Sequence, residues 1–184
     1  MVKNWTFGQQ LGAGYALAGL TLLVVAVVGY QSISTLIDND ALVAHTQLVR
    51  RDFSDLLSSL KDAETGQRGF TITGDDSYLA PYQSALPVIS RVFGELRNLT
   101  SDNPHQQQRL NAILPLINSK LDILRRTIAL RRSGGLDPAV KAVASGEGKD
   151  LMDQIRAIVT AADGEEAALF EQRDALAQSS AQRS

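Results

Sequence analysis

The stretch Asp62-Ala-Glu-Thr-Gly-Gln-Arg-Gly-Phe-Thr-Ile-Thr-Gly-Asp-Asp-Ser-Tyr-Leu-Ala-Pro-Tyr82 decides the fold of this chain. A long helical pattern stops within it, turns and starts again. Three glycines and the β-branched run from Thr71 to Thr73 lower helix propensity there. Asp75 or Asp76 can then accept hydrogen bonds from the free N–H groups of a new helix. The stretch therefore predicts the corner of a helical hairpin.

Polar and aromatic side chains gather around this corner. Glu64 and Arg68 lie four residues apart and share one face of the outgoing helix. Tyr78 and Tyr82 begin the next helix at the same end, and antiparallel register places Arg156 of the last helix level with Glu64. One interpretation is a polar pocket or switchable ion-pair group for a small ligand or a partner. The other is a Glu64–Arg156 pair with tyrosine caps that fixes register and contributes about 1 kcal/mol.

Two groups of motifs, one before and one after the middle of the chain, carry a family resemblance. The first group is Glu64-Thr-Gly-Gln-Arg-Gly-Phe70, Thr73-Gly-Asp75 and Tyr78-Leu-Ala-Pro-Tyr82. The second is Ser145-Gly-Glu-Gly-Lys-Asp-Leu-Met-Asp-Gln-Ile-Arg156, Glu165-Glu166 and Arg173. In this order they resemble the two halves of the CHASE-three domain, an extracellular sensory module of bacterial transmembrane receptors. The resemblance implies a second membrane helix and a cytoplasmic output, often a histidine kinase, beyond Ser184.

The composition favours an all-helical chain without catalytic chemistry. Aromatic residues make up 5% of the 184 residues, and the net charge of -2 gives no basis for nucleic-acid binding. The absence of cysteine excludes disulfides and thiolate metal sites, and the two histidines, His45 and His105, lie far apart. The sequence has no Gly-rich phosphate loop, no Ser/His/Asp set and no HExxH motif. We therefore predict no enzyme activity, no cofactor and no metal site.

An uncharged segment near the N-terminus predicts a membrane helix. Residues 11–30 carry no charge, and as a helix they span about 30 Å, the thickness of a bilayer core. Lys3 precedes the segment and two aspartates follow it. The positive-inside rule then places residues 1–10 in the cytoplasm and the rest outside, in the periplasm of a cell with an inner membrane. A cleavable signal peptide is the alternative, but the uncharged stretch is long for one.

Small residues repeat along this helix. Gly8, Gly12 and Ala16 stand four residues apart, a spacing that lets two membrane helices approach closely. We therefore expect a homodimer. The other interpretation is that these small residues face lipid and make no helix contact.

Apolar residues in alternating steps of three and four predict four long helices. The expected ranges are residues 7–69, 76–100, 106–132 and 149–182. Leu86 and Phe93 of the second helix and Leu121 of the third are among the residues expected to face inward. The first and fourth extend outside the membrane for about 52 and 51 Å, the second and third for about 37 and 40 Å. These lengths predict an antiparallel up-down-up-down four-helix bundle over residues 36–182, continuous with the membrane helix. Pro87 and Pro115 are expected to kink their helices, and Pro138 to start a short helical turn.

Three polar residues fall on these apolar seams: Gln67, Glu166 and Arg173. Polar seam residues weaken packing but can specify partner and register, or mark a plane that shifts. Snorkelling of the charged ones to solvent stays open.

Together these features predict the sensory input module of a bacterial transmembrane receptor, most often a sensor histidine kinase in the family it resembles. A small molecule or protein outside the cell would bind at the corner, and helix shifts of about 1–2 Å would cross the membrane. The alternative is a membrane-anchored helical adaptor or structural bundle that transmits no signal.

Overall fold

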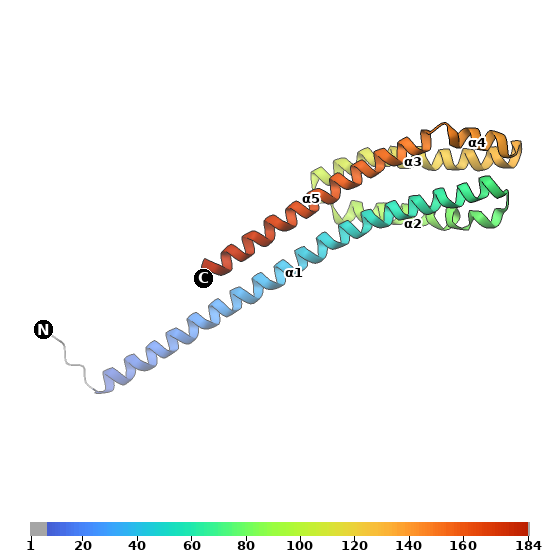
Figure 1. Ribbon diagram of the computed structural model, residues 1–184. Coiled ribbons are helices and arrows are strands. Elements are labelled where there is room, and N and C mark those ends of the chain that lie inside the picture. The colour runs from blue at the N-terminus through green and yellow to red at the C-terminus, as the bar shows by residue number, and fades with distance from the viewer. Residues whose placement is uncertain (1–6, 184) are drawn as a thin grey trace. The chain divides into compact units, whose positions relative to one another are not determined.

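The computed structural model describes the backbone of residues 7–183, and in this range every element is helical (Figure 1). Side chains are described except at residues 9–10, 32–33, 35–41, 173–174 and 176–183. The elements are α1 (Phe7–Thr73), the 3-10 turn η1 (Asp76–Leu79), α2 (Ala80–Leu99), α3 (Pro104–Gly134), α4 (Leu136–Ala144) and α5 (Glu147–Arg183). The prediction of an all-helical chain is confirmed.

The chain divides into two compact units, one of residues 1–44 with 170–184 and the other of His45–Leu169, which we call the core unit. The first unit contains Leu11–Gln31, a 21-residue segment of mean hydropathy 2.2 with none of its length buried in the protein. This segment is long and apolar enough to cross a membrane, and it matches the predicted span of residues 11–30. The predicted domain limits at residues 10, 30 and 36 stay predictions.

The core unit is built around apolar side chains from four helices. Leu60 of α1, Leu96 of α2, Leu110 of α3 and Ile155 of α5 each have no exposed surface. The buried apolar residues around them come from all four helices: Val49, Phe53, Leu56, Ala63, Ala85, Ile89, Val92, Ile113, Ile117, Leu124, Met152, Val159 and Ala162. Burial of one such large side chain stabilises the folded chain by about 2 kcal/mol. This packing holds the helix faces on which the polar residues lie.

The seam of α1 follows the predicted spacing, whereas the seam of α2 differs. The inner residues of α2 are Ala85, Ile89, Val92 and Leu96. Leu86 and Phe93, expected inside, are half-buried, and Tyr78 of η1 is 49% exposed. The buried face of α2 is therefore rotated about the helix axis from the predicted face, with Ala85 and Val92 in the core in place of Leu86 and Phe93.

Helix α1 continues one turn beyond its predicted end at Gly69 and stops at Thr73. Phe70 packs against Leu79 and Ile128 in a second small apolar cluster, and this burial outweighs the poor helix propensity of the segment. The amide of Gly74 then donates to the carbonyl of Phe70 over 2.8 Å. Gly74 has φ of +73°, a conformation that favours glycine, so it ends the helix.

Two glycines allow the chain to fold back tightly at this corner. A Cβ atom on Gly66 would lie 2.7 Å from the backbone nitrogen of Tyr82. One on Gly69 would lie 2.7 Å from Cδ1 of Tyr78. Both distances are shorter than real Cβ contacts, so the absence of a side chain at these positions permits η1 and α2 to close onto α1.

The remaining helix limits follow from capping residues. Asn103 accepts hydrogen bonds from the amides of His105 and Gln106, over 3.1 and 3.2 Å, and so starts α3 at Pro104. Pro87 lies inside α2 and Pro115 inside α3. The short turn expected at Pro138 is a nine-residue helix, α4, anchored by the fully buried Ala139.

Candidate functional site

Four residues of α1 and three of α5 line a cavity of about 310 Å³ in the core unit, which we call the α1–α5 groove. The lining residues are Lys61, Glu64, Thr65, Arg68, Lys149, Met152 and Arg156. Three of the five residues predicted to cluster at the corner therefore share one cavity. Most of the lining is charged, so the groove suits a polar ligand rather than an apolar one.

Glu64 holds two cations at once. Its Oε1 atom lies 2.7 Å from Nη2 of Arg68, and its Oε2 atom lies 2.8 Å from Nζ of Lys120. Lys120 is 1% exposed and also donates to the carbonyl of Gly148 over 2.9 Å. A buried ammonium group needs such partners, because an unpaired charge in the interior is costly. One carboxylate thus connects α1 with α3, and through Lys120 with the first turn of α5.

Arg156 has a different partner from the one expected. Its Nη1 atom donates to Asp153 over 2.7 Å, and Lys149 donates to the same carboxylate over 2.6 Å. The hydrogen bond from Lys149 lowers the pKa of Asp153 and the same bond raises the pKa of Lys149. Since Arg156 pairs along its own helix, the interpretation of a Glu64–Arg156 register pair is wrong. Arg156 and Glu64 instead stand on the same groove.

The two tyrosines lie beside this groove rather than in it. Tyr82 is half-buried and packs against the apolar core. Tyr78 lines a second cavity, of about 260 Å³, together with Thr65, Gly66, Ser77 and Pro81. Thr65 lines both cavities, so the two are neighbours on α1.

The polar seam residues are buried where the structure describes them. Gln67 is 3% exposed and donates to Oγ1 of Thr71 over 2.6 Å. Glu166 is 4% exposed and accepts a 3.0 Å hydrogen bond from Gln106, which also donates to the carbonyl of Ala162. The side chain of Arg173 lies outside the described residues. Snorkelling therefore does not apply to Glu166, which joins α5 to α3 inside the core unit.

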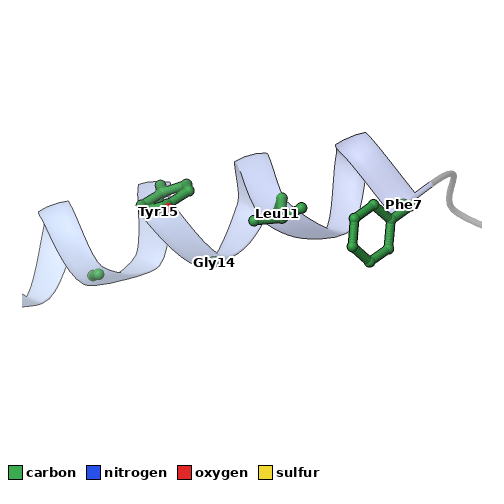
Figure 2. Close-up of a pocket in the computed structure, with 5 residues that line it drawn as sticks. Phe7, Leu11, Gly14 and Tyr15 are labelled. Atoms are coloured by element: carbon green, nitrogen blue, oxygen red, sulfur yellow. The ribbon is translucent and has the colours of Figure 1, made fainter.

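The small residues of the membrane segment face open space in the single chain. A Cβ atom on Gly8 or Gly12 would have no neighbouring atom within 4 Å, and Ala16 is exposed. A shallow cavity of about 480 Å³ lies along the same part of α1, and Figure 2 labels Phe7, Leu11, Gly14 and Tyr15 of its lining. The role of the small residues in dimerisation stays a prediction.

Lys120 is the main site residue that the sequence reasoning missed. It falls in the same alternating spacing as the inner residues of α3, between Ile117 and Leu124. The prediction gave this place to Leu121, which is half-buried. A lysine in register with an apolar seam was the available signal for a buried ion pair. Within the described residues, no group of three or more His, Asp or Glu side chains is placed to hold a metal ion.

Comparison with known proteins identifies the family. The model of the CHASE3 domain matches residues 39–175. Among solved structures, the crystal structure of the Rhodopseudomonas palustris histidine kinase HK9 sensor domain matches with a TM-score of 0.63 and 23% identity. The match covers 67% of this chain and 97% of that chain. At this identity the likeness concerns the fold. Comparison with curated proteins gives no match.

Proposed function

The chain belongs to the CHASE3 domain family and is a sensory input module, and we propose that it serves a bacterial transmembrane receptor by relaying ligand-induced helix shifts. The output we favour is a sensor histidine kinase. The chain itself contributes no catalytic step in this proposal. Its site is the α1–α5 groove, where Glu64, Arg68 and Arg156 stand together.

The observation that carries the proposal is the double pairing of Glu64. Arg68, on the groove side, is 56% exposed, whereas Lys120 on the inner side is 1% exposed. A ligand that draws Arg68 away leaves Glu64 to Lys120 alone. Lys120 also donates to the carbonyl of Gly148 in the first turn of α5. Occupancy of the groove can therefore alter the packing of that first turn against α1 and α3. A ligand shifts the equilibrium only by its differential affinity for the two packings.

The direction of the helices supports a relay along the molecule. Near the corner, α1 meets α5 through the groove, and farther along Arg50 of α1 pairs with Asp163 of α5 over 2.6 Å. Residue numbers rise along one helix as they fall along the other, which supports the antiparallel up-down-up-down order. In this arrangement α1 and α5 carry the difference toward the membrane as a shift of about 1–2 Å.

The expected setting is the inner membrane of a bacterial cell. The uncharged Leu11–Gln31 segment supports a membrane anchor. Lys3 before it supports a cytoplasmic N-terminus with the core unit in the periplasm. Gly8, Gly12 and Ala16 support a homodimer through the membrane helices, in contact with lipid. The ligand would be a small molecule or protein outside the cell.

A thermal-melting screen tests the sensor function. The full chain in lipid nanodiscs is melted against a panel of metabolites, and a ligand is expected to raise the midpoint. Arg68→Ala should abolish that shift. Arg91→Ala is the matched control, since Arg91 makes the same kind of i,i+4 pair with Glu95 and is similarly exposed but lies outside the groove. Equal responses of both variants would count against the groove.

A membrane-anchored adaptor that transmits nothing is the second candidate function, and the buried Lys120–Glu64 pair is compatible with it as a purely structural lock. Paired spin labels distinguish the two. The chain has no cysteine, so Ser54→Cys on α1 and Thr160→Cys on α5, both exposed, can be labelled selectively. A receptor requires the label distance to change with ligand, and an adaptor requires it to stay constant.

A further inference from the structure

We propose that the α1–α5 groove binds a small anion with two or more negative charges, such as inorganic phosphate or a di- or tricarboxylate. This inference rests on the proposed sensory function and names the ligand class of the same site. It depends on the balance of charge in and around the groove, on the position of Glu64, which buried Lys120 holds, and on the exposure of the lysine and arginine side chains.

The groove has an excess of positive charge. The cationic side chains that line or adjoin it are Lys61, Arg68, Lys120, Lys149 and Arg156. The carboxylates that face these cations are Glu64, Asp150 and Asp153. Five cations against three carboxylates leave an excess of two positive charges. A concave surface with an excess of one sign of charge raises the local concentration of ligands of the opposite sign.

The excess positive charge is available to a ligand because each of two carboxylates is shared between two cations. Glu64 is divided between Arg68 and Lys120, and Asp153 between Lys149 and Arg156. In the part of the chain that the structure describes, Lys61 has no ion-pair partner. A cation that shares one carboxylate with another retains donors for a second anion, and arginine offers a planar fork that fits carboxylate or phosphate oxygens.

The two sides of the groove differ in how far their charged side chains are exposed to solvent. Glu64 is 16% exposed and is held from behind by the buried Lys120. Lys61, Arg68, Lys149 and Arg156 are exposed side chains on helix surfaces. Their long stems let the charged ends turn toward a ligand while the backbone positions stay fixed by the apolar core. A cavity of about 310 Å³ suits a molecule the size of phosphate or citrate rather than a peptide.

Calorimetric titration of the full chain in nanodiscs of zwitterionic lipid tests the proposal. The probes are inorganic phosphate, succinate and citrate, with sodium chloride matched for ionic strength as the blank. We expect saturable binding that weakens as salt is raised, because partly exposed charges are screened. Binding of phosphate but not of succinate or citrate, or the reverse, would show which type of anion within this class the groove prefers.

Two variants and one control locate the binding. Lys61→Gln and Arg156→Gln should each weaken the affinity by about threefold to fivefold, the effect of one partly exposed charge. Arg125→Gln is the control, because Arg125 makes an i,i+3 pair with Asp122 as Arg156 does with Asp153 but does not line the groove. An unchanged affinity in Arg125→Gln supports the site. No saturable binding by the unmodified chain, or equal weakening in all three variants, overturns it.

The label pair at residues 54 and 160 separates failure of this inference from failure of the proposed function. If an uncharged metabolite raises the melting midpoint and changes the label distance while no anion binds, the sensor function stands and the anion proposal is overturned. If anions bind through Lys61 and Arg156 but leave the label distance constant, the anion site is supported and the relay fails.

Discussion

Lys120 Nζ lies 2.8 Å from Oε2 of Glu64, on the buried face of α3 between the apolar residues Ile117 and Leu124. Lysine is almost never fully buried without a partner. Here the partner is a carboxylate at the edge of the α1–α5 groove, and the carbonyl of Gly148 takes a second donor of the same ammonium group. The buried charge of α3 is therefore fixed by one residue of α1 and one of α5.

Replacing Lys120 tests the strength of this link. Lys120→Met should destabilise the chain by about 2–4 kcal/mol, because it leaves Glu64 with one partner and the Gly148 carbonyl with none from Lys120. The measurement is urea unfolding in detergent micelles. Glu64→Gln should recover part of the loss when combined with Lys120→Met. Lys149→Met, at an exposed ion pair, should change stability by less than about 1 kcal/mol. Equal effects at residues 120 and 149 would contradict the buried pair.

The tight corner predicts opposite effects for two glycine substitutions. Gly66→Ala forces a Cβ atom against the backbone nitrogen of Tyr82 and should destabilise the chain by about 1–3 kcal/mol. Gly94→Ala, inside α2 with nothing within 4 Å of the added Cβ, should stabilise it by up to about 1 kcal/mol. The same unfolding assay compares the two. A neutral or stabilising Gly66→Ala would mean that α2 can move away from α1 at little cost.

Acid should weaken the end of the core unit opposite the corner. Burial alone would raise the pKa of Glu165, but hydrogen bonds from Arg109 and Asn103 and the charge of Arg109 outweigh it, so the pKa lies below its ordinary value. A lowered folded-state pKa contributes stability that is complete above the unfolded value of 4.5 and is lost as pH falls below it. The melting midpoint should therefore drop on acidification through that range.

Glu165→Gln supplies the control for this pH dependence. The variant should be less stable than the unmodified chain near neutral pH and should lose less on acidification, so that the two melting curves converge. Parallel curves at all pH values would assign the acid sensitivity to other carboxylates.

The membrane helix predicts a dimer that depends on one face. Gly12→Ile places a bulky side chain in the line of Gly8 and Ala16 and should weaken dimerisation by about tenfold. Gly14→Ile changes the opposite side of the same helix and should leave dimerisation unchanged. Single-molecule photobleaching in nanodiscs measures the dimer fraction. If both variants dimerise like the unmodified chain, the small residues face lipid.

Spacing of apolar residues predicted the long helices because it records burial directly. The inner face of α1, from Val49 to Ala63, follows steps of three and four and is buried in the structure. Such spacing does not indicate where a helix ends when the helix continues through residues of low helix propensity. The last turn of α1 was missed for this reason, since Phe70 is buried by contacts with residues distant in sequence.

The candidate site was predicted in part. Glu64 and Arg68 pair as their spacing indicated, because the contact lies within one helix. Arg156 was assigned to Glu64 from its height in the bundle, but the competing Asp153 lies three residues away on its own helix and pairs with it. Lys120 was missed because an apolar neighbour, Leu121, satisfied the pattern. Position along the bundle axis predicts which residues lie near one another. It does not predict which of several nearby charged groups a side chain pairs with.

The closed corner has a mechanical consequence for the core unit. Arg131 of α3 donates to the carbonyl of Thr71, and its guanidinium lies where any side chain on Gly74 would stand. With the Phe70 cluster, these contacts join the end of α1, η1 and α3 into one packed cap. The buried apolar residues of α5 belong to the larger apolar cluster of the core unit instead. Its first turn is held to α3 by the hydrogen bond from Lys120 to the carbonyl of Gly148 and by the Arg126–Glu147 ion pair. In the proposed relay, α5 is therefore the helix expected to shift, while the cap is expected to stay in place.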